Sequence, residues 1–210
     1  MRRLFDPENP IISTLNDLTD LVILGLLWMI CCIPVVTIGA SCTAFCYAYN
    51  KFFVKKEGHA AKLFFHAFAA NFKQATILWL IMVGILAFLG ADYYLSRAAL
   101  EEMPFLSVPL VLVIAIFIFV IMWSQYVFAY LARFENNTKN IMINSALIML
   151  VNFPWSFLLL ALFTVAVLFF PLILFAAAIL YMVVANKIHE RVFSKYIKRV
   201  EEGVSEDADL

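Results

Sequence analysis

Residues 103–132, MPFLSVPLVLVIAIFIFVIMWSQYVFAYLA, form a run without a single Asp, Glu, Lys or Arg. About 20 apolar residues are enough for a helix to cross the hydrocarbon core of a bilayer. Two further uncharged runs lie at 74–91 and 140–186. The chain is 65% hydrophobic and 14% charged, whereas soluble domains are roughly 45–50% apolar and about 25% charged. The sequence therefore predicts an all-α membrane protein.

Six membrane spans account for the apolar segments, which predicts a polytopic transmembrane helix bundle in one domain of residues 1–200. The predicted spans are 15–33, 36–53, 75–94, 108–131, 153–170 and 172–187. An alternative with five spans treats the first two as one broken or re-entrant element. Residues 201–210 are predicted to form a disordered acidic tail.

The distribution of basic residues predicts the orientation of the chain. Fourteen of the 15 Lys and Arg residues lie in segments that six spans place on one side of the membrane, and Arg97 is the exception. Because basic loops stay in the cytoplasm, both termini are expected there. An even number of spans satisfies this arrangement in a bacterial cytoplasmic (plasma) membrane. The formal net charge of zero gives no support for nucleic-acid binding.

The loop at 58–73 is predicted to be a cytoplasmic amphipathic helix with aromatic residues on one face. One interpretation is an interfacial helix that packs on its own bundle or lies among the headgroups. The other is a docking helix for a protein partner. In that hypothesis the partner-binding residues are Phe64, Phe65 and Phe68, and contacts to the partner or to anionic lipid come from Lys55, Lys56 and Lys62.

Residues 33–40, IPVVTIGA, predict a tight structural turn between the first two spans. Pro34 lacks an amide donor and interrupts a helix, and Gly39 permits backbone approaches that a Cβ would block. Thr37 is expected to donate a hydrogen bond to a freed carbonyl, since broken backbone in lipid needs such partners. A ligand or ion site at a broken helix is the alternative.

Other polar residues in the apolar segments are candidates for function as well as for structure. Asp17 and Asp20 are interpreted as interfacial capping residues, with a proton or cation relay as the alternative. Ser124 and Gln125 are expected to make interhelical hydrogen bonds, with a substrate contact as the alternative. Small buried hydrophobes are the default role of Cys31, Cys32, Cys42 and Cys46, while His59, His66 and His189 lack metal-site spacing. The sequence predicts no catalytic residue, metal or cofactor.

The chain also matches itself weakly at a constant shift of 81 residues. This pattern suggests a duplicated unit, although chance composition is an alternative. The matched pairs are Ala48-Tyr49 with Ala129-Tyr130, Phe53 with Phe134, and Asn71-Phe72 with Asn152-Phe153.

The segments PVVTIGA at 34–40, Thr43-Ala44, Tyr47-Ala48 and NFKQA at 71–75 resemble the YesL-like family of bacterial integral membrane proteins. The resemblance implies a polytopic protein of a Gram-positive bacterium with an accessory role in carbohydrate uptake. We therefore expect a non-enzymatic protein that stabilises or regulates an ATP-binding cassette (ABC) importer of oligosaccharides by contacting its permease or ATPase subunits. An independent small-solute transporter or channel is the alternative, and a homo-oligomer is left open.

Overall fold

The computed structural model describes residues 10–99, 107–169 and 176–208, and every regular element in these segments is a helix. The prediction of an all-α protein is confirmed for this part of the chain. The α-helices are α1 (Pro10–Cys32), α2 (Ile38–Tyr49), α3 (Ala60–Ala99), α4 (Ser107–Leu131), α5 (Thr138–Val151), α6 (Phe153–Phe169) and α7 (Ala176–Ala208). A 3₁₀ turn, η2 (Val35–Thr37), precedes α2, and a π-helix, η3 (Asn50–Val54), follows it.

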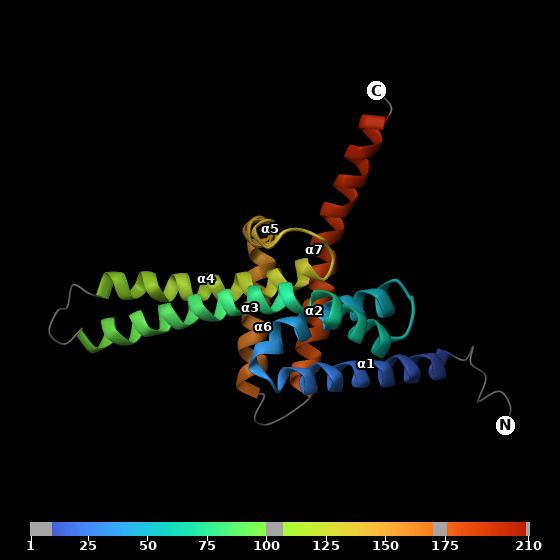
Figure 1. Ribbon diagram of the computed structural model, residues 1–210, viewed down its shortest axis with the longest axis horizontal. Helices are drawn as coiled ribbons and strands as arrows, with labels where there is room; N and C mark the ends of the chain where they lie inside the picture. Colours follow the sequence, from blue (N-terminus) through green and yellow to red (C-terminus); the bar gives the residue numbers. More distant parts are fainter. Residues whose placement is uncertain (1–9, 100–106, 170–175, 209–210) are drawn as a thin grey trace.

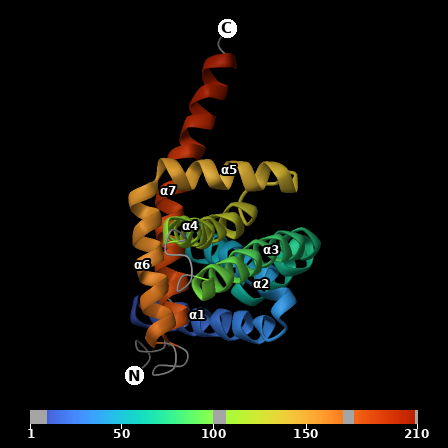
Figure 2. The ribbon, with the colours of Figure 1, turned by 90° about the vertical axis from the view of Figure 1, so that its left-hand side faces the viewer.

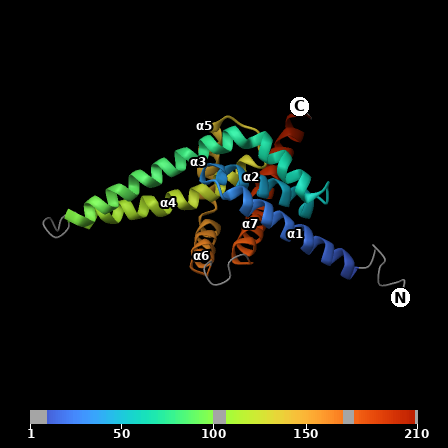
Figure 3. The ribbon, with the colours of Figure 1, turned by 60° about the horizontal axis from the view of Figure 1, so that its bottom comes forward.

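The helices form two hairpins that lie crosswise to each other. Helices α3 and α4 run antiparallel and project to one side, at the left of Figure 1, while α6 and α7 lie next to each other across them (Figures 1 and 2). Helix α1 extends in the direction opposite to the α3–α4 hairpin (Figure 3). Helix α2 packs between α1 and α3, and α5 crosses the end of α4.

Two of the described helices are long and apolar enough to cross a membrane, at Ala60–Ala98 and Pro109–Leu131. The segments Thr138–Val151 and Phe153–Val167 would make a third span if the pair, which bends by 98°, counts as one. This is fewer than the six spans predicted. One reason is that α2 and α6, which correspond to two of the predicted spans, contain only 12 and 17 residues, so they rise about 18 and 26 Å against a core of roughly 30 Å.

Helix α3 differs from the sequence prediction because it is one continuous helix of 40 residues. The amphipathic segment expected at 58–73 and the span expected at 75–94 are therefore joined without a break in the helix, although the path of α3 is bent (Figure 3). No proline interrupts the segment, and residues around Lys73 and Gln74 keep helical geometry. The aromatic segment is thus rigidly attached to a helix that is long enough to enter the membrane.

The proposed duplication shows matching local packing where its two copies leave α2 and α4. The rings of Tyr49 and Phe53 lie 5.1 Å apart at an interplanar angle of 31°, and those of Tyr130 and Phe134 lie 4.6 Å apart at the same angle. Both copies then turn into a helix. The similarity in ring geometry supports the internal repeat at this point.

The two copies diverge one residue beyond the matched Asn-Phe pairs. Asn71 and Asn152 each donate a side-chain hydrogen bond to the carbonyl four residues earlier. The shift of 81 residues then aligns Lys73 with Pro154. Proline disfavours helical geometry in the residue before it and cannot donate to the helix ladder. This substitution explains why α3 stays helical through Lys73 while the helix breaks between α5 and α6, which meet at 98°.

Helix α7 also extends beyond its predicted range. The span expected at 172–187 is part of a helix that starts at Ala176 and reaches Ala208, and its C-terminal part passes α5 (Figures 1 and 2). Most of the segment predicted as a disordered tail at 201–210 is therefore helical here. Glu201, Glu202 and Glu206 are good helix formers, whereas Gly203 is a poor one.

Candidate functional site

The predicted structural turn at 33–40 is built largely from local contacts. Pro34 precedes the 3₁₀ turn with extended backbone angles, φ −74° and ψ 117°. The Thr37 hydroxyl lies 2.6 Å from the carbonyl oxygen of Cys31 and 2.7 Å from that of Pro34. A single hydroxyl thus serves the carbonyls that the helix break leaves free, which is the role expected of Thr37.

Near the turn, α2 packs closely against α3 and α4 at Gly39. A Cβ on Gly39 would lie 2.7 Å from the carbonyl oxygen of Ala75, 2.7 Å from Cβ of Trp79 and 2.9 Å from Cε1 of Phe128. Two of these neighbours cannot rotate away, since one is backbone and the other is the first side-chain carbon. The geometry of the residues predicted for the turn is therefore explained by contacts within the protein.

The aromatic residues predicted to share one partner face are divided between the interior and the surface. Phe64 is fully buried and packs in a cluster with Leu24 and Phe45. Phe68 is partly buried and stacks on Phe64 with a centroid distance of 6.1 Å. Phe65 is 52% exposed. Phe64 is consequently a core residue in this structure, because the short loop before α3 folds the start of that helix onto α1 and α2.

The lysines predicted for the same surface lie at its edge. Lys55 and Lys62 are exposed. Lys56 has a positive φ of 57° and forms an ion pair of 3.0 Å with Asp17 of α1. That pair ties the loop between α2 and α3 to α1 and gives Asp17 a structural contact.

An internal cavity of about 400 Å³ lies where the two hairpins cross, and it is the strongest candidate for a binding site. Its walls come from α1, α2, α3, α4, α6 and α7 and are mostly apolar. Pockets of this size with a few polar groups are typical of small-molecule sites. The lining residues that the argument uses are Trp28, Trp79, Gln125, Tyr181, Asn186 and His189.

Several polar atoms of this lining have no hydrogen-bond partner among the described residues. They are Nε1 of Trp28, Nε2 of Gln125, Oδ1 of Asn186 and both ring nitrogens of His189. Asn186 is 1% exposed and His189 is 3% exposed. Leaving a buried polar group unsatisfied costs about 1–3 kcal/mol, and each of these atoms has less than 1 Å² of accessible surface.

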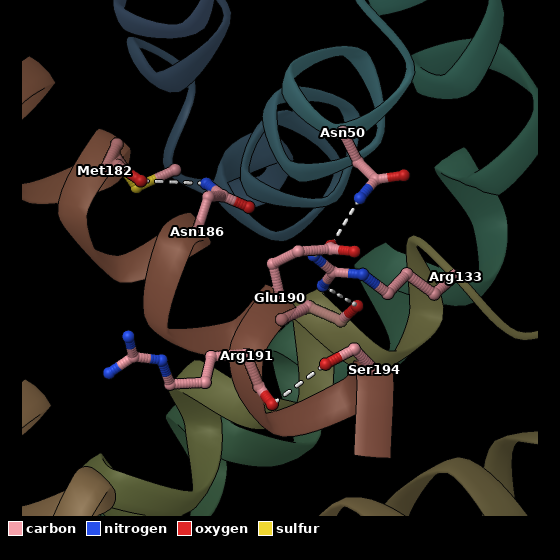
Figure 4. Close-up of polar contacts among 8 residues, drawn as sticks. Asn50, Arg133, Met182, Asn186, Glu190, Arg191 and Ser194 are labelled. Atoms are coloured by element: carbon pink, nitrogen blue, oxygen red, sulfur yellow. Dashed lines mark hydrogen bonds and ion pairs between the residues drawn. The ribbon is translucent and has the colours of Figure 1, made fainter. Parts of the chain in front are cut away.

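The remaining polar atoms of Gln125 and Asn186 already form hydrogen bonds within the protein, and these bonds fix the orientation of both side-chain amides. Tyr181 donates a hydrogen bond of 2.6 Å to Oε1 of Gln125. Asn186 donates from Nδ2 to the carbonyl oxygen of Met182 at 2.9 Å (Figure 4). The prediction that Gln125 makes an interhelical hydrogen bond is met by this contact between α4 and α7. Its Nε2 group stays free to donate.

His189 lies two residues beyond the predicted last span and packs between aromatic rings. Its ring centroid is 4.9 Å from that of Tyr126 and 6.0 Å from that of Phe193. Burial, with a smaller contribution from the nearby Arg133 charge, lowers the pKa of His189 to about 3. The imidazole is therefore neutral near pH 7 and offers one donor and one acceptor.

A charged cluster lies one helical turn beyond the cavity. Nη2 of Arg133 and Oε2 of Glu190 form an ion pair of 2.6 Å, and Asn50 donates a hydrogen bond to the same carboxylate oxygen (Figure 4). The Arg133 guanidinium also lies 4.8 Å from the ring centroid of Phe193. This cluster joins the end of α2, the end of α4 and the middle of α7, and it keeps its charges paired outside the cavity.

The remaining candidate groups are the cysteines and the possible metal ligands in the described part of the chain. All four cysteines are free thiols. No group of three or more His, Cys, Asp or Glu side chains that could hold a metal ion occurs within residues whose positions are described. The sequence prediction identified Gln125 and Ser124, both of which line the cavity, but it gave no role to Tyr181, Asn186 or His189. The signal that could have found them is Asn186 at the end of a long uncharged run.

Comparison with known proteins finds a family match over the first part of the chain, and this match neither confirms nor contradicts the YesL-like resemblance. No curated protein and no solved structure matches. Residues 21–93 match the model of a family described as "Protein of unknown function, DUF624". The match includes the turn at 33–40 and the segment 71–75, which carry the resemblance, and it extends over most of α1, all of α2 and most of α3.

Proposed function

We propose that the protein is a non-enzymatic accessory protein of the bacterial cytoplasmic membrane that binds an oligosaccharide importer of the ABC class and stabilises or regulates it. The observation that carries the proposal is the exposed aromatic surface at the start of α3. Phe65 and Phe72 are 52% and 39% exposed there, and Lys55 and Lys62 are exposed beside them. Aromatic side chains of this kind are enriched in protein interfaces.

The proposed orientation places this surface in the cytoplasm. The basic loop between α2 and α3 and the basic residues of α7 then lie on the inner side, as the distribution of Lys and Arg favours. Both termini are cytoplasmic if the number of spans is even, and six is the number that the hydropathy pattern favours. Importer ATPase subunits are cytoplasmic, so a partner surface on this side can reach them.

The surface can be tested by purification from native membranes in a mild detergent. The wild-type protein is expected to recover importer permease or ATPase subunits, and Phe65→Ala with Phe72→Ala is expected to abolish the recovery. Phe88→Ala is the matched control, because Phe88 is 74% exposed on the same helix but lies in the apolar half. Repeated recovery of the wild-type protein alone, or equal recovery by the double variant, would refute the proposal.

A second candidate function is transport of a small solute, which the cavity lined by Ser124 and Gln125 favours. Two other polar residues of the apolar segments lie apart from the cavity: Thr37 bonds to backbone carbonyls and Asp17 pairs with Lys56. Purified protein in liposomes should move a sugar, proton or cation if this candidate is correct. Absence of flux for all three solutes would count against transport and favour the accessory function.

A further inference from the structure

Helix α5 presents an aliphatic face to its surroundings, although it is too short to cross a membrane alone. Its 14 residues rise about 21 Å against a hydrocarbon core of roughly 30 Å. Between residues 141 and 151 every exposed side chain of this helix is aliphatic, with exposed fractions of 46% to 73%. We call these side chains the α5 stripe, since their spacing keeps them on one side of the helix: Ile143, Leu147, Leu150 and Val151.

The polar side chains in the same part of α5 point into the protein and form hydrogen bonds there. Ser145 is fully buried, and its hydroxyl accepts a hydrogen bond of 3.0 Å from Nε1 of Trp123 on α4. Nδ2 of Asn144 donates to the hydroxyl of Tyr130, also on α4, at 3.1 Å. A helix that faces water has the opposite arrangement, with its polar side chains outside and its apolar ones inside. The inverted pattern of α5 indicates that the α5 stripe faces lipid.

The direction of α5 places the stripe along the membrane instead of through it. Figure 1 shows α4 along its length and α5 nearly end-on, and Figure 2 shows the reverse, so the two helices cross at a large angle. Because α4 is long and apolar enough to cross a membrane, α5 then lies close to the membrane plane. Its contacts with Trp123 and Tyr130 put it beside the last two turns of α4, which ends at Leu131 just before Arg133. This is the depth at which a bilayer changes from acyl chains to headgroups.

The composition of the α5 stripe favours lipid over a protein as its partner. The centres of protein interfaces are enriched in aromatic and Arg side chains, and Leu and Val are under-represented among the residues that dominate binding. The stripe has no aromatic or charged member, unlike the surface around Phe65 and Phe72 on α3. The exposed apolar surface also continues onto α6 at Phe157 and Leu158, within the uncharged run at 140–186. The stripe therefore lacks, on that side, the polar rim of a protein interface.

We propose that α5 is an interfacial helix, which keeps its axis in the membrane plane and inserts the α5 stripe among the acyl chains of the leaflet next to the basic loops. Lys139 is exposed one helical turn before Ile143. Its ammonium group reaches the lipid phosphates while its stem lies along the acyl chains. The bilayer surface is thus the partner of α5, and α5 and α6 do not form one bent span. The proposal does not depend on association with an importer.

Spin labels in proteoliposomes of phosphatidylglycerol and phosphatidylethanolamine measure the depth of the stripe. A nitroxide is attached to Ile143→Cys, Leu147→Cys or Leu150→Cys in a full-length variant without the native cysteines. Power saturation then compares the access of oxygen, which enters lipid, with the access of a water-soluble nickel chelate. We expect high oxygen access, low chelate access and nearly equal depths at the three sites. A helix that crosses the membrane would instead change depth by about 10 Å over the seven residues from Ile143 to Leu150.

Helix α4 provides the matched control for depth. Val111 and Ile118 are 64% and 40% exposed and lie seven residues apart, as Ile143 and Leu150 do. Labels at Val111→Cys and Ile118→Cys should therefore differ in depth by about 10 Å in the same vesicles. A label at Lys55→Cys marks the aqueous limit, because Lys55 is exposed in the loop between α2 and α3, and it should show high chelate access.

High chelate access along the α5 stripe, with low access on α4, would overturn the proposal and favour a protein partner for this face. A depth gradient from Ile143 to Leu150 as steep as the one on α4 would overturn it in favour of a span that continues into α6. High chelate access on α4 as well would overturn it together with the membrane location of the chain. The labelled positions are on the surface, and helix content by circular dichroism checks the fold of each variant. Ile143 with either of the other two stripe positions is enough to measure the gradient.

Discussion

At the residue scale, Gly39 offers the sharpest test of the packing between α2 and α3. Gly39→Ala places a methyl group 2.7 Å from backbone and Cβ atoms, and such overpacking is expected to lower the free energy of unfolding by about 1–3 kcal/mol. Titration with sodium dodecyl sulfate in mixed micelles measures it. Gly84→Ala is the control, because nothing lies within 4 Å of its added Cβ. Equal stability of the two variants would contradict this packing.

The ion pair of Arg133 and Glu190 predicts a second residue-scale effect. Glu190→Gln leaves a guanidinium that is 7% exposed without its counter-charge, which should destabilise the protein by about 2 kcal/mol, less than for a fully buried pair. The Lys51 ammonium lowers the pKa of Glu57 through a hydrogen bond at an exposed site. Glu57→Gln therefore serves as the control and should leave the melting temperature unchanged. A similar loss in both variants would show that the buried pair has no special role.

His189 predicts how stability depends on pH. Its pKa falls from 6.5 to about 3 in the folded chain, so below about pH 6.5 the unfolded chain binds a proton that the folded chain does not. Stability therefore decreases as pH falls through this window, by at most about 1.4 kcal/mol per pH unit. His189→Phe keeps the ring and should flatten the melting profile between about pH 5 and pH 7.5, whereas exposed His66→Gln should not. Parallel profiles for His189→Phe and the wild type would count against a buried neutral imidazole.

Single residues were predictable from the sequence where their contacts are local. Thr37 bonds to carbonyls three and six residues away, so the pattern of the turn was enough to predict its role. The cavity residues were not predictable in the same way. Tyr181 meets Gln125 across 56 residues of sequence, and that contact depends on how α7 crosses α4, which no local pattern encodes.

At the element scale, the continuity of α3 can be measured as a distance. Spin labels at Lys62→Cys and Arg97→Cys, in a variant without the native cysteines, should give one narrow distance distribution, centred below the about 50 Å of a straight helix of 35 residues because α3 is continuous but bent (Figure 3). Lys73→Pro introduces the residue found at the aligned position of the second copy and should broaden this distribution. A broad distribution in the chain that retains Lys73 would instead favour two separate helices.

The same comparison explains which elements were predictable. Helix α4 (Ser107–Leu131) coincides with the segment predicted at 108–131, because a long uncharged run has one interpretation. The sequence predicts a helix boundary near residue 74, where an amphipathic pattern changes to a uniformly apolar one, but α3 has no break there. Hydropathy depends on the surroundings of a helix, whereas a proline indicates where a helix ends. Only the second copy of the repeat carries a proline at this position, Pro154, which aligns with Lys73.

At the scale of the whole molecule, the two ends of α3 should lie on opposite sides of the membrane. An impermeant maleimide applied to intact cells is expected to label Arg97→Cys and to label Lys56→Cys only after lysis, because basic loops stay inside. Both sites are exposed, so burial would not explain a difference. Labelling of Lys56→Cys in intact cells would refute the proposed orientation.

The right-angled junction of α5 and α6 has a mechanical consequence for the molecule. Asn152 bonds from its side chain to the carbonyl oxygen of Ile148 and to the hydroxyl of Tyr196, and the Ser156 hydroxyl contacts the carbonyl oxygen of Met149 at 3.0 Å. These hydrogen bonds hold α5 and α6 at a fixed angle to each other. Rotation of α6 about its own axis, for instance as a molecule enters or leaves beside it, would therefore move the far end of α5 sideways across the end of α4.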